Sequence, residues 1–273
     1  MHRKLLFTSV ILLMSLTALC FGQKQIVYKQ VDTTSLVMRI YSPEKQDPEK
    51  QYPAIVFFFG GGWNSGSIGQ FEPHAKHFAE RGMVCFLVDY RVKSRQKTSP
   101  FESLKDAKSA MRYVRKNAKQ FNVDPDRIAA SGGSAGGHLA AATAITNEYN
   151  ESTDDLTISS VPNALVLFNP VIDNGPAGYG YERVGEAYKN FSSLHNIKKG
   201  MPPTIIMVGT KDKLIPVETV SYYKKAMEIV GSRCDLSLYE GEEHGFFNVK
   251  NKENHQKTLM EADKFLQSLG YIK

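Results

Sequence analysis

The stretch from Ile128 to Ala141, IAASGGSAGGHLAA, constrains the fold of this chain more than any other. It opens with apolar residues typical of the end of a buried strand, and it ends in an alanine-rich run that predicts a helix. Gly132, Ser134 and Gly136 between them fit G-x-S-x-G, the nucleophile-elbow pattern, in which a sharp strand-to-helix turn holds a serine hydroxyl above a sheet. Side chains beside the serine would clash in so tight a turn. The same pattern also occurs in ordinary glycine-rich turns, so its interpretation depends on the rest of the chain.

The segments around this turn alternate between predicted strands and predicted helices. Two segments near the start alternate apolar with polar residues, which predicts a half-exposed hairpin. Continuous apolar runs further on predict strands buried on both faces of a sheet. The predicted strands are 26–31, 36–42, 53–59, 83–88, the run before Ser134, 164–168, 204–208 and 235–239, and the predicted helices are 71–81, 101–121, 139–145, 217–230 and 254–269. This order predicts an α/β fold with about eight strands, mostly parallel, and helices on both faces.

The N-terminus has the form of a secretory signal peptide. His2-Arg3-Lys4 precedes an apolar run over 5–21, and small residues follow. We expect residues 1–22 to be removed before Gln23, residues 23–273 to form a single catalytic domain, and the product to be secreted or periplasmic. Two alternatives stay open: a lipoprotein acylated at Cys20, although Leu19 is bulky for that signal, and an uncleaved membrane anchor, although the run is short for a span.

Charge and cysteine content exclude several classes of function. The net charge of +6 comes from dispersed basic residues without an arginine-rich arm or a nucleic-acid motif, so we expect a solvated basic surface and no nucleic-acid partner. Cys85 and Cys234 lie in or beside apolar runs, which favours two buried free thiols, although export would permit a disulfide. Their spacing offers no metal site, and we expect neither a metal nor a cofactor.

Two further residues suit the chemistry of a reactive serine. A serine hydroxyl is a weak nucleophile at neutral pH, and it needs a histidine to accept its proton and a carboxylate to orient that histidine. Asp212 and His244 each follow a predicted strand, in that order after Ser134. The sequence therefore predicts Ser134, His244 and Asp212 as a catalytic triad. Asp173, which follows the preceding strand, competes with Asp212 for the role of the acid, and His138 is expected to be structural.

A tetrahedral intermediate also needs backbone N–H donors for its oxyanion. Ala135 follows the predicted nucleophile directly, so its N–H supplies one donor. The others are expected from the run Gly60-Gly61-Gly62 after the third strand, where the absence of side chains lets a substrate approach the backbone. A plain glycine-rich turn is the alternative interpretation of that run.

Several motifs together resemble the α/β-hydrolase superfamily, and more narrowly its hormone-sensitive-lipase-like and acetyl-esterase branch. They are Gly60-Gly-Gly-Trp63, Asp89-Tyr-Arg91, Asp124-Pro-Asp-Arg-Ile128, Gly133-Ser-Ala-Gly-Gly-His-Leu139, Met201-Pro-Pro203 and the segments around Asp212 and His244. The resemblance covers nearly the whole chain after residue 22. It implies an α/β-hydrolase fold with oxyanion donors at Gly61 and Gly62. The chain departs from the branch at Phe59, where a histidine is usual, and at Val92-Lys-Ser-Arg95, where many carboxylesterases have Leu-Ala-Pro-Glu.

The resemblance implies a serine esterase that works through an acyl-enzyme and takes short acyl groups. Together with the export signal and the absence of a large cap domain, it leads us to expect removal of acetyl groups from small-molecule, oligosaccharide or polysaccharide esters outside the cell. A peptidase of the prolyl-oligopeptidase type and a non-catalytic homologue that binds a ligand stay open as alternatives. Residues 169–203 are long and rich in Gly, Pro and Tyr, as expected for a lid or binding loop. Tyr179, Tyr181 and Phe191 in that segment either line a pocket or pack in the core.

Overall fold

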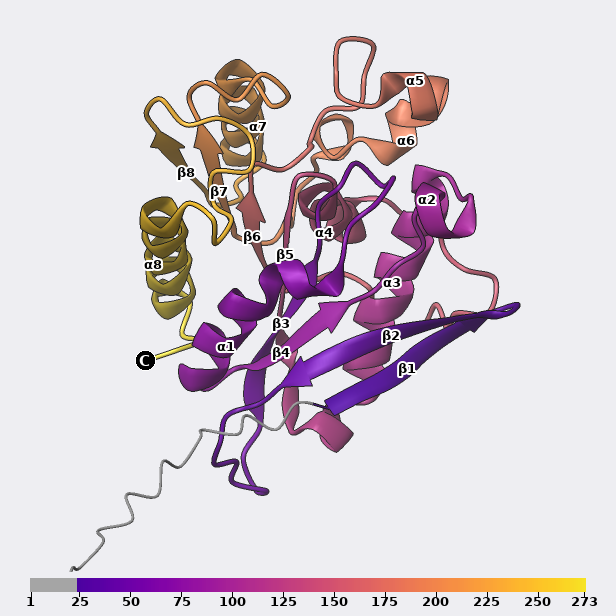
Figure 1. Cartoon of the computed structure of the whole chain (residues 1–273), viewed down its shortest axis with the longest axis vertical. Coiled ribbons are helices and arrows are strands. Elements are labelled where there is room, and N and C mark those ends of the chain that lie inside the picture. The colour runs from indigo at the N-terminus through magenta and orange to yellow at the C-terminus, as the bar shows by residue number, and fades with distance from the viewer. Residues whose placement is uncertain (1–23) are drawn as a thin grey trace, which may run out of the picture.

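The computed structural model describes residues 24–273, and the described chain forms one eight-stranded sheet covered by helices (Figure 1). The strand order is β1-β2-β4-β3-β5-β6-β7-β8, and the strands are β1 (Lys24–Val31), β2 (Thr34–Tyr41), β3 (Tyr52–Phe58), β4 (Val84–Val88), β5 (Val123–Gly133), β6 (Ala164–Phe168), β7 (Thr204–Gly209) and β8 (Cys234–Tyr239). β2 runs antiparallel to both of its neighbours, and every other neighbouring pair is parallel. The predicted mostly parallel eight-stranded α/β-hydrolase fold is confirmed.

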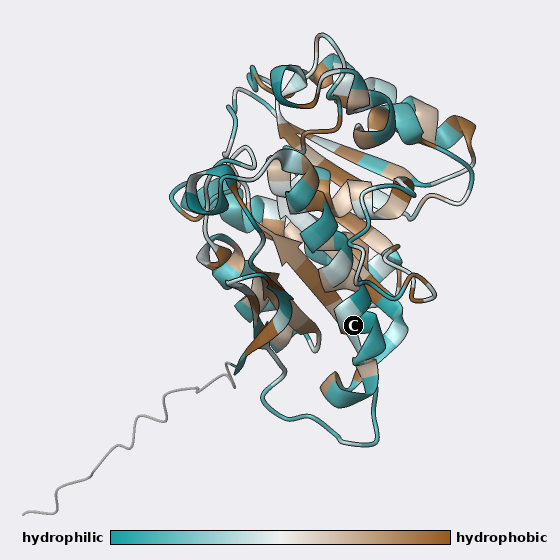
Figure 2. Ribbon diagram, turned by 90° about the vertical axis from the view of Figure 1, so that its right-hand side faces the viewer, coloured by the Kyte–Doolittle hydropathy of each residue, from teal (hydrophilic) through white to brown (hydrophobic). Residues whose placement is uncertain are grey.

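Helices cover both faces of this sheet. On one face lie α3 (Pro100–Lys116), α4 (Ala135–Ile145) and α7 (Val217–Ile229), and on the other lie α1 (Glu72–Glu80) and α8 (Lys252–Ser268). The short helices α2 (Lys93–Gln96), α5 (Tyr181–Val184) and α6 (Tyr188–Phe191) lie near one end of the sheet (Figure 1). Figure 2 shows the apolar strands inside and many polar residues on the helices around them.

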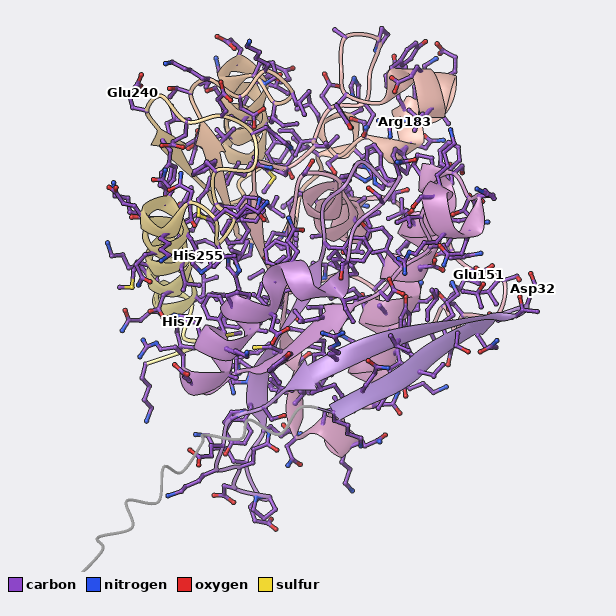
Figure 3. All side chains as sticks on the ribbon, in the orientation of Figure 1. Asp32, His77, Glu151, Arg183, Glu240 and His255 are labelled. Carbon is purple, nitrogen blue, oxygen red and sulfur yellow. The ribbon has the colours of Figure 1, made fainter. Side chains whose placement is uncertain are left out.

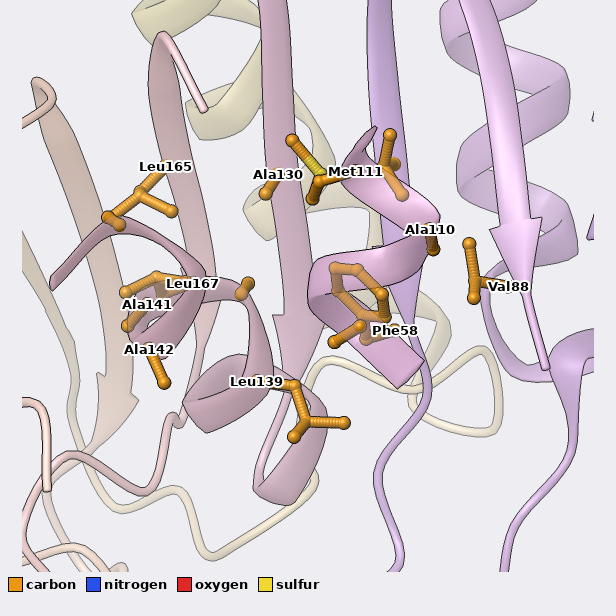
Figure 4. Close-up of a cluster of buried hydrophobic side chains, with 14 of the residues drawn as sticks. Phe58, Val88, Ala110, Met111, Ala130, Leu139, Ala141, Ala142, Leu165 and Leu167 are labelled. Atoms are coloured by element: carbon orange, nitrogen blue, oxygen red, sulfur yellow. The ribbon is translucent and has the colours of Figure 1, made fainter. Parts of the chain in front are cut away.

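The core consists of two apolar layers, one on each side of the sheet. Successive side chains of a strand point to opposite faces, so the continuous apolar runs of β3 and β4 supply both layers. Phe58 and Val88 pack with Met111 and Leu139 under α3 and α4 (Figure 4), whereas Phe57 joins the layer under α1 and α8. These buried runs explain why the sequence predicted β3 and β4 well.

Two predicted helices differ from the structure by four residues or more at one end. The helix predicted over 101–121 ends at Lys116, and a 3₁₀ turn, Ala118–Phe121, follows it. Both Ala118 and Phe121 remain buried, so the apolar spacing continues although the α-helix does not. The helix after the serine turn begins at Ala135, four residues earlier than predicted.

The predicted signal peptide, residues 1–22, and Cys20 within it lie outside the described residues. Among the residues that the structure describes, no helix has the length and apolar character needed to cross a membrane. Cys85 in β4 and Cys234 in β8 are buried free thiols, as predicted, and four strands separate them in the sheet. Burial raises the pKa of the Cys234 thiol to about 12.

Candidate active site

Ser134 lies at the turn between β5 and α4, in the middle of the sheet. Its φ of 54° and ψ of −120° belong to a region that residues other than glycine rarely adopt, and such strain is often found at functional sites. The serine N–H donates a hydrogen bond of 3.0 Å to the carbonyl of Phe168, which fixes the turn to β6. A Cβ atom on Gly136 would lie 2.0 Å from the carbonyl oxygen of Phe58, so only glycine lets α4 approach β3 this closely.

The structure brings the three predicted side chains together at the carboxyl ends of the parallel strands. The Nε2 atom of His244 lies 2.9 Å from the Ser134 Oγ, and its Nδ1 atom lies 2.7 Å from the Asp212 Oδ2. The other carboxylate oxygen of Asp212 accepts hydrogen bonds of 2.9 Å from the N–H groups of Leu214 and Ile215. The Asp212 side chain is fully buried, whereas that of His244 is 23% exposed. This arrangement can accept a proton from the serine and hold the histidine in place.

Asp173, the competing acid, has different contacts. Its carboxylate accepts a hydrogen bond from the N–H of Gly175 and lies 3.7 Å from the Nδ1 atom of His195. The geometry therefore favours Asp212 as the partner of His244. His138 is fully buried, with its Nε2 atom 3.0 Å from the carbonyl oxygen of Phe191, and burial lowers its pKa to about 4.

The three predicted oxyanion donors near the serine have no protein acceptor among the described residues. They belong to Gly61, Gly62 and Ala135, whereas the N–H of Gly60 donates to the Gln70 side chain at 2.7 Å. Ala135 is the first residue of α4, where helix geometry leaves the N–H without a partner and the helix dipole favours negative charge. Gly61 has a φ of 129° and Gly62 a φ of 62°, so the glycine run follows a path that other residues rarely adopt. These three groups are the predicted oxyanion donors.

The sequence analysis missed Asn169, which follows β6 directly. Its side chain is buried, its Oδ1 atom accepts a hydrogen bond of 3.0 Å from the N–H of Gly245, and its Nδ2 atom lies 3.4 Å from the Nε2 atom of His244. Asn169 therefore holds the loop that carries the histidine. The available signal was its position at the carboxyl end of a strand, which it shares with Asp212 and His244.

The segment over 169–203 contacts the glycine run through Arg183, which Figure 3 labels. This guanidinium donates to the carbonyl oxygen of Gly62 and lies about 5 Å from the ring centres of both Trp63 and Tyr179. Of the three aromatic residues left open by the sequence, Tyr179 borders a pocket and Phe191 is buried in the core. Tyr181 donates a hydrogen bond to Glu186.

The fold and these contacts define an α/β-hydrolase with the side-chain arrangement of a serine hydrolase. Comparison with known families is more specific. The BD-FAE family model matches residues 38–176, and the dienelactone hydrolase family model matches residues 167–269. The chain belongs to the BD-FAE family and is an esterase of the α/β-hydrolase superfamily.

Individual relatives are also esterases. The apo structure of Thermogutta terrifontis esterase 2 is 46% identical with a TM-score of 0.88, and the match covers 92% of this chain and 96% of that one. The chain is 27% identical to an acetylxylan esterase of Xylanibacter ruminicola, over 98% of this chain and 55% of the relative. It is 26% identical to the esterase LipC of Mycobacterium tuberculosis, over 74% of this chain and 55% of the relative. The chain thus spans about half the length of the curated relatives it matches.

Proposed function

We propose that this protein is an exported serine esterase that removes acetyl groups from carbohydrate esters. The observation that carries the proposal is the chain of contacts from Asp212 through His244 to Ser134, with distances of 2.7 and 2.9 Å, beside three N–H groups without protein acceptors. A nucleophile, an oriented base and oxyanion donors in one place suit acyl transfer to water.

In the first half of the reaction, the Ser134 Oγ attacks the ester carbonyl carbon while His244 accepts the serine proton at Nε2. Asp212 stabilises the imidazolium that forms, because its carboxylate already faces Nδ1 at 2.7 Å. The carbonyl oxygen becomes an oxyanion that the N–H groups of Gly61, Gly62 and Ala135 bind. Collapse of this intermediate breaks the bond to the alcohol, which leaves with the proton from His244.

In the second half, a water molecule takes the place of the alcohol. His244 accepts a proton from this water, and the resulting hydroxide attacks the carbonyl carbon of the acyl-enzyme. The same N–H groups bind the second oxyanion, and the bond to the serine breaks as His244 returns the proton to the Oγ atom. The acid is released and Ser134 is restored.

The acetyl and carbohydrate parts of the proposal rest on relatives and on the leader sequence. Besides the acetylxylan esterase, an endo-1,4-beta-xylanase B of Butyrivibrio fibrisolvens is 27% identical over 179 residues, which make up 62% of this chain and 28% of that relative. Both names refer to xylan, a polysaccharide that organisms meet outside their cells. The signal-like segment over residues 1–22 supports export to the place where such polymers are found.

A pair of serine variants tests the catalytic assignment. With p-nitrophenyl acetate as the substrate, we expect turnover by the wild type and a loss of about a millionfold in Ser134→Ala. Ser131→Ala is the matched control, because Ser131 is a fully buried serine of β5, three residues before Ser134, and its hydroxyl has no partner among the described residues. Absence of turnover by the wild type, or equal activity of both variants, would contradict the proposal.

A substrate panel tests whether the enzyme acts on acetylated carbohydrates. We expect release of acetate from acetylated xylan, mannan or pectin and no cleavage of a prolyl peptide. If the peptide is cleaved faster than every acetylated polymer, the chain is a peptidase instead. Locating the protein in culture medium, periplasm or cytosol by immunoblot tests export, and retention of the full-length chain in the cytosol would contradict it.

A further inference from the structure

A pocket of about 450 Å³ adjoins the glycine run beside the candidate active site. Gly62, one of the proposed oxyanion donors, forms part of its wall. The residues around it include three cationic side chains, Lys93, Lys97 and Arg183, and no carboxylate. The mechanism proposed above uses none of these three cations, so their gathering around one pocket needs a separate explanation.

Hydrogen bonds hold the three walls of this pocket together. The N–H of Lys93 donates to the carbonyl oxygen of Trp63 at 3.0 Å, and this bond joins α2 to the glycine run. The Arg183 guanidinium donates to the carbonyl oxygen of Gly62 and lies over the rings of Trp63 and Tyr179, which joins α5 to the same run. The pocket therefore has a fixed position relative to Ser134 through the backbone that also carries the oxyanion donors.

None of the three cations at this pocket is held in a buried ion pair within residues 24–273. Lys93 and Lys97 are exposed, and neither takes part in an ion pair with a carboxylate of the described chain. Arg183 has one acidic partner, Glu182, at 3.0 Å, but that side chain is 71% exposed and the pair is weakened by solvent. A negatively charged group that enters the pocket would meet three cations without displacing a strong internal pair.

We propose that this pocket selects esters whose alcohol portion carries a negative charge, such as a carboxylate-bearing sugar ring. The inference rests on the proposed acetyl-esterase function. An acetyl group has a single carbon beyond the carbonyl, so the alcohol is the part of the substrate large enough to occupy a pocket of about 450 Å³. Among acetylated polysaccharides, those that contain uronic acids fit this chemistry and neutral ones do not.

Matched pairs of simple esters test the proposal. The first pair is para-acetoxybenzoate, with a negative charge on the alcohol portion, and the neutral para-acetoxybenzamide. We compare the ratio of their kcat/KM values between the wild type and the variant Lys93→Gln/Lys97→Gln, so that the intrinsic reactivity of each ester and any change in catalytic power cancel. The ratio of kcat/KM for the charged ester to that for the neutral ester should be about fivefold lower in the double variant than in the wild type, as expected for two exposed charges. The wild-type ratio should also fall as NaCl screens the lysines, while the ratio of the variant stays flat.

The control is Lys116→Gln/Lys119→Gln, which removes the same charge from the last residue of α3, about 24 Å along the helix from Pro100, and from the 3₁₀ turn that follows it. Its ratio should equal that of the wild type. A second pair, p-nitrophenyl hemisuccinate and p-nitrophenyl butyrate, places the charge on the acid portion.

The outcomes distinguish failure of the pocket assignment from failure of the esterase proposal. A ratio that is the same in Lys93→Gln/Lys97→Gln as in the wild type overturns the pocket assignment, while turnover of p-nitrophenyl acetate leaves the esterase proposal standing. Loss of selectivity for the hemisuccinate pair alone also overturns it, because the pocket then holds the acid portion. If no ester is turned over, the esterase function itself fails. A final comparison of acetylated pectin with acetylated mannan should show a preference for pectin that depends on the same two lysines.

Discussion

The substitution Asp212→Asn offers the sharpest test of the candidate active site. The two oxygens of the Asp212 carboxylate have different partners. Oδ2 lies 2.7 Å from His244 Nδ1, and Oδ1 accepts hydrogen bonds of 2.9 Å from the N–H groups of Leu214 and Ile215. An asparagine keeps its oxygen toward the two backbone donors, because the alternative would bring an NH₂ group against two N–H groups. Its NH₂ group must then face His244.

This orientation changes the proton on the histidine. An NH₂ donor beside Nδ1 favours the tautomer in which Nδ1 accepts and Nε2 carries the hydrogen. The Ser134 Oγ, 2.9 Å from Nε2, then faces a donor and loses its base. We expect kcat for p-nitrophenyl acetate to fall by about ten-thousandfold, which corresponds to about 5.5 kcal/mol of transition-state stabilisation. The thermal unfolding midpoint should change little, because the asparagine keeps the shape and both backbone hydrogen bonds.

Asp173→Asn is the matched control, since it neutralises the competing acid after the neighbouring strand. Its carboxylate contacts Gly175 and His195 and not His244, so we expect kcat within about twofold of the wild type. The reasoning is refuted if Asp212→Asn keeps more than about a tenth of the wild-type kcat, a loss far below that expected of a triad acid. It is equally refuted if the two variants lose activity to the same extent while both stay folded.

Three further predictions concern stability, each measured by denaturant unfolding. Gly136→Ala should lower the free energy of unfolding by about 3 kcal/mol through overpacking against β3, whereas Gly69→Ala, with only ordinary contact around it, should change it by less than about 1 kcal/mol. Asp106→Asn should cost about 3 to 5 kcal/mol, because its fully buried carboxylate pairs with Arg91 at 2.8 Å. Burial lowers the pKa of His74 well below its usual value, so the unfolded chain binds a proton that the native chain does not. The free energy of unfolding therefore falls as the pH drops below about 6.5. His74→Phe should reduce the slope of this free energy against pH by about 1.4 kcal/mol per pH unit.

The fold was predictable where burial imposes a simple pattern on the sequence. β3 and β4 are buried along their whole length, so each appears as an unbroken apolar run with clear ends. The end of α3 was not predictable in the same way. Ala118 and Phe121 continue the apolar spacing because both are buried, but the backbone there tightens to a 3₁₀ turn, which a single turn of spacing does not distinguish from an α-helix.

The candidate site was predictable to the extent that it depends on chain order. Ser134, Asp212 and His244 each follow a strand, and parallel strands bring their carboxyl ends to one edge of the sheet. Asn169 also follows a strand directly, but an asparagine at that position does not by itself indicate a role, and Arg183 follows no strand. Asn169 needs a φ of 34° to reach the histidine loop, and Arg183 contacts Gly62 across 121 positions of the chain from a segment without periodicity. Contacts of this kind depend on tertiary packing that no local pattern records.

Packing around Phe59 takes the place of the hydrogen bonds that are lost with the histidine usual at this position. A histidine at this position would hold the glycine run through hydrogen bonds. Here the Phe59 ring stacks on Tyr90 with 4.0 Å between ring centres, and the Tyr90 hydroxyl donates to the Phe59 carbonyl oxygen at 2.6 Å. The next residue, Gly60, donates its N–H to Gln70 at 2.7 Å. The start of the glycine run is thus fixed by two side chains from other elements, so the proposed donors at Gly61 and Gly62 do not depend on the missing histidine.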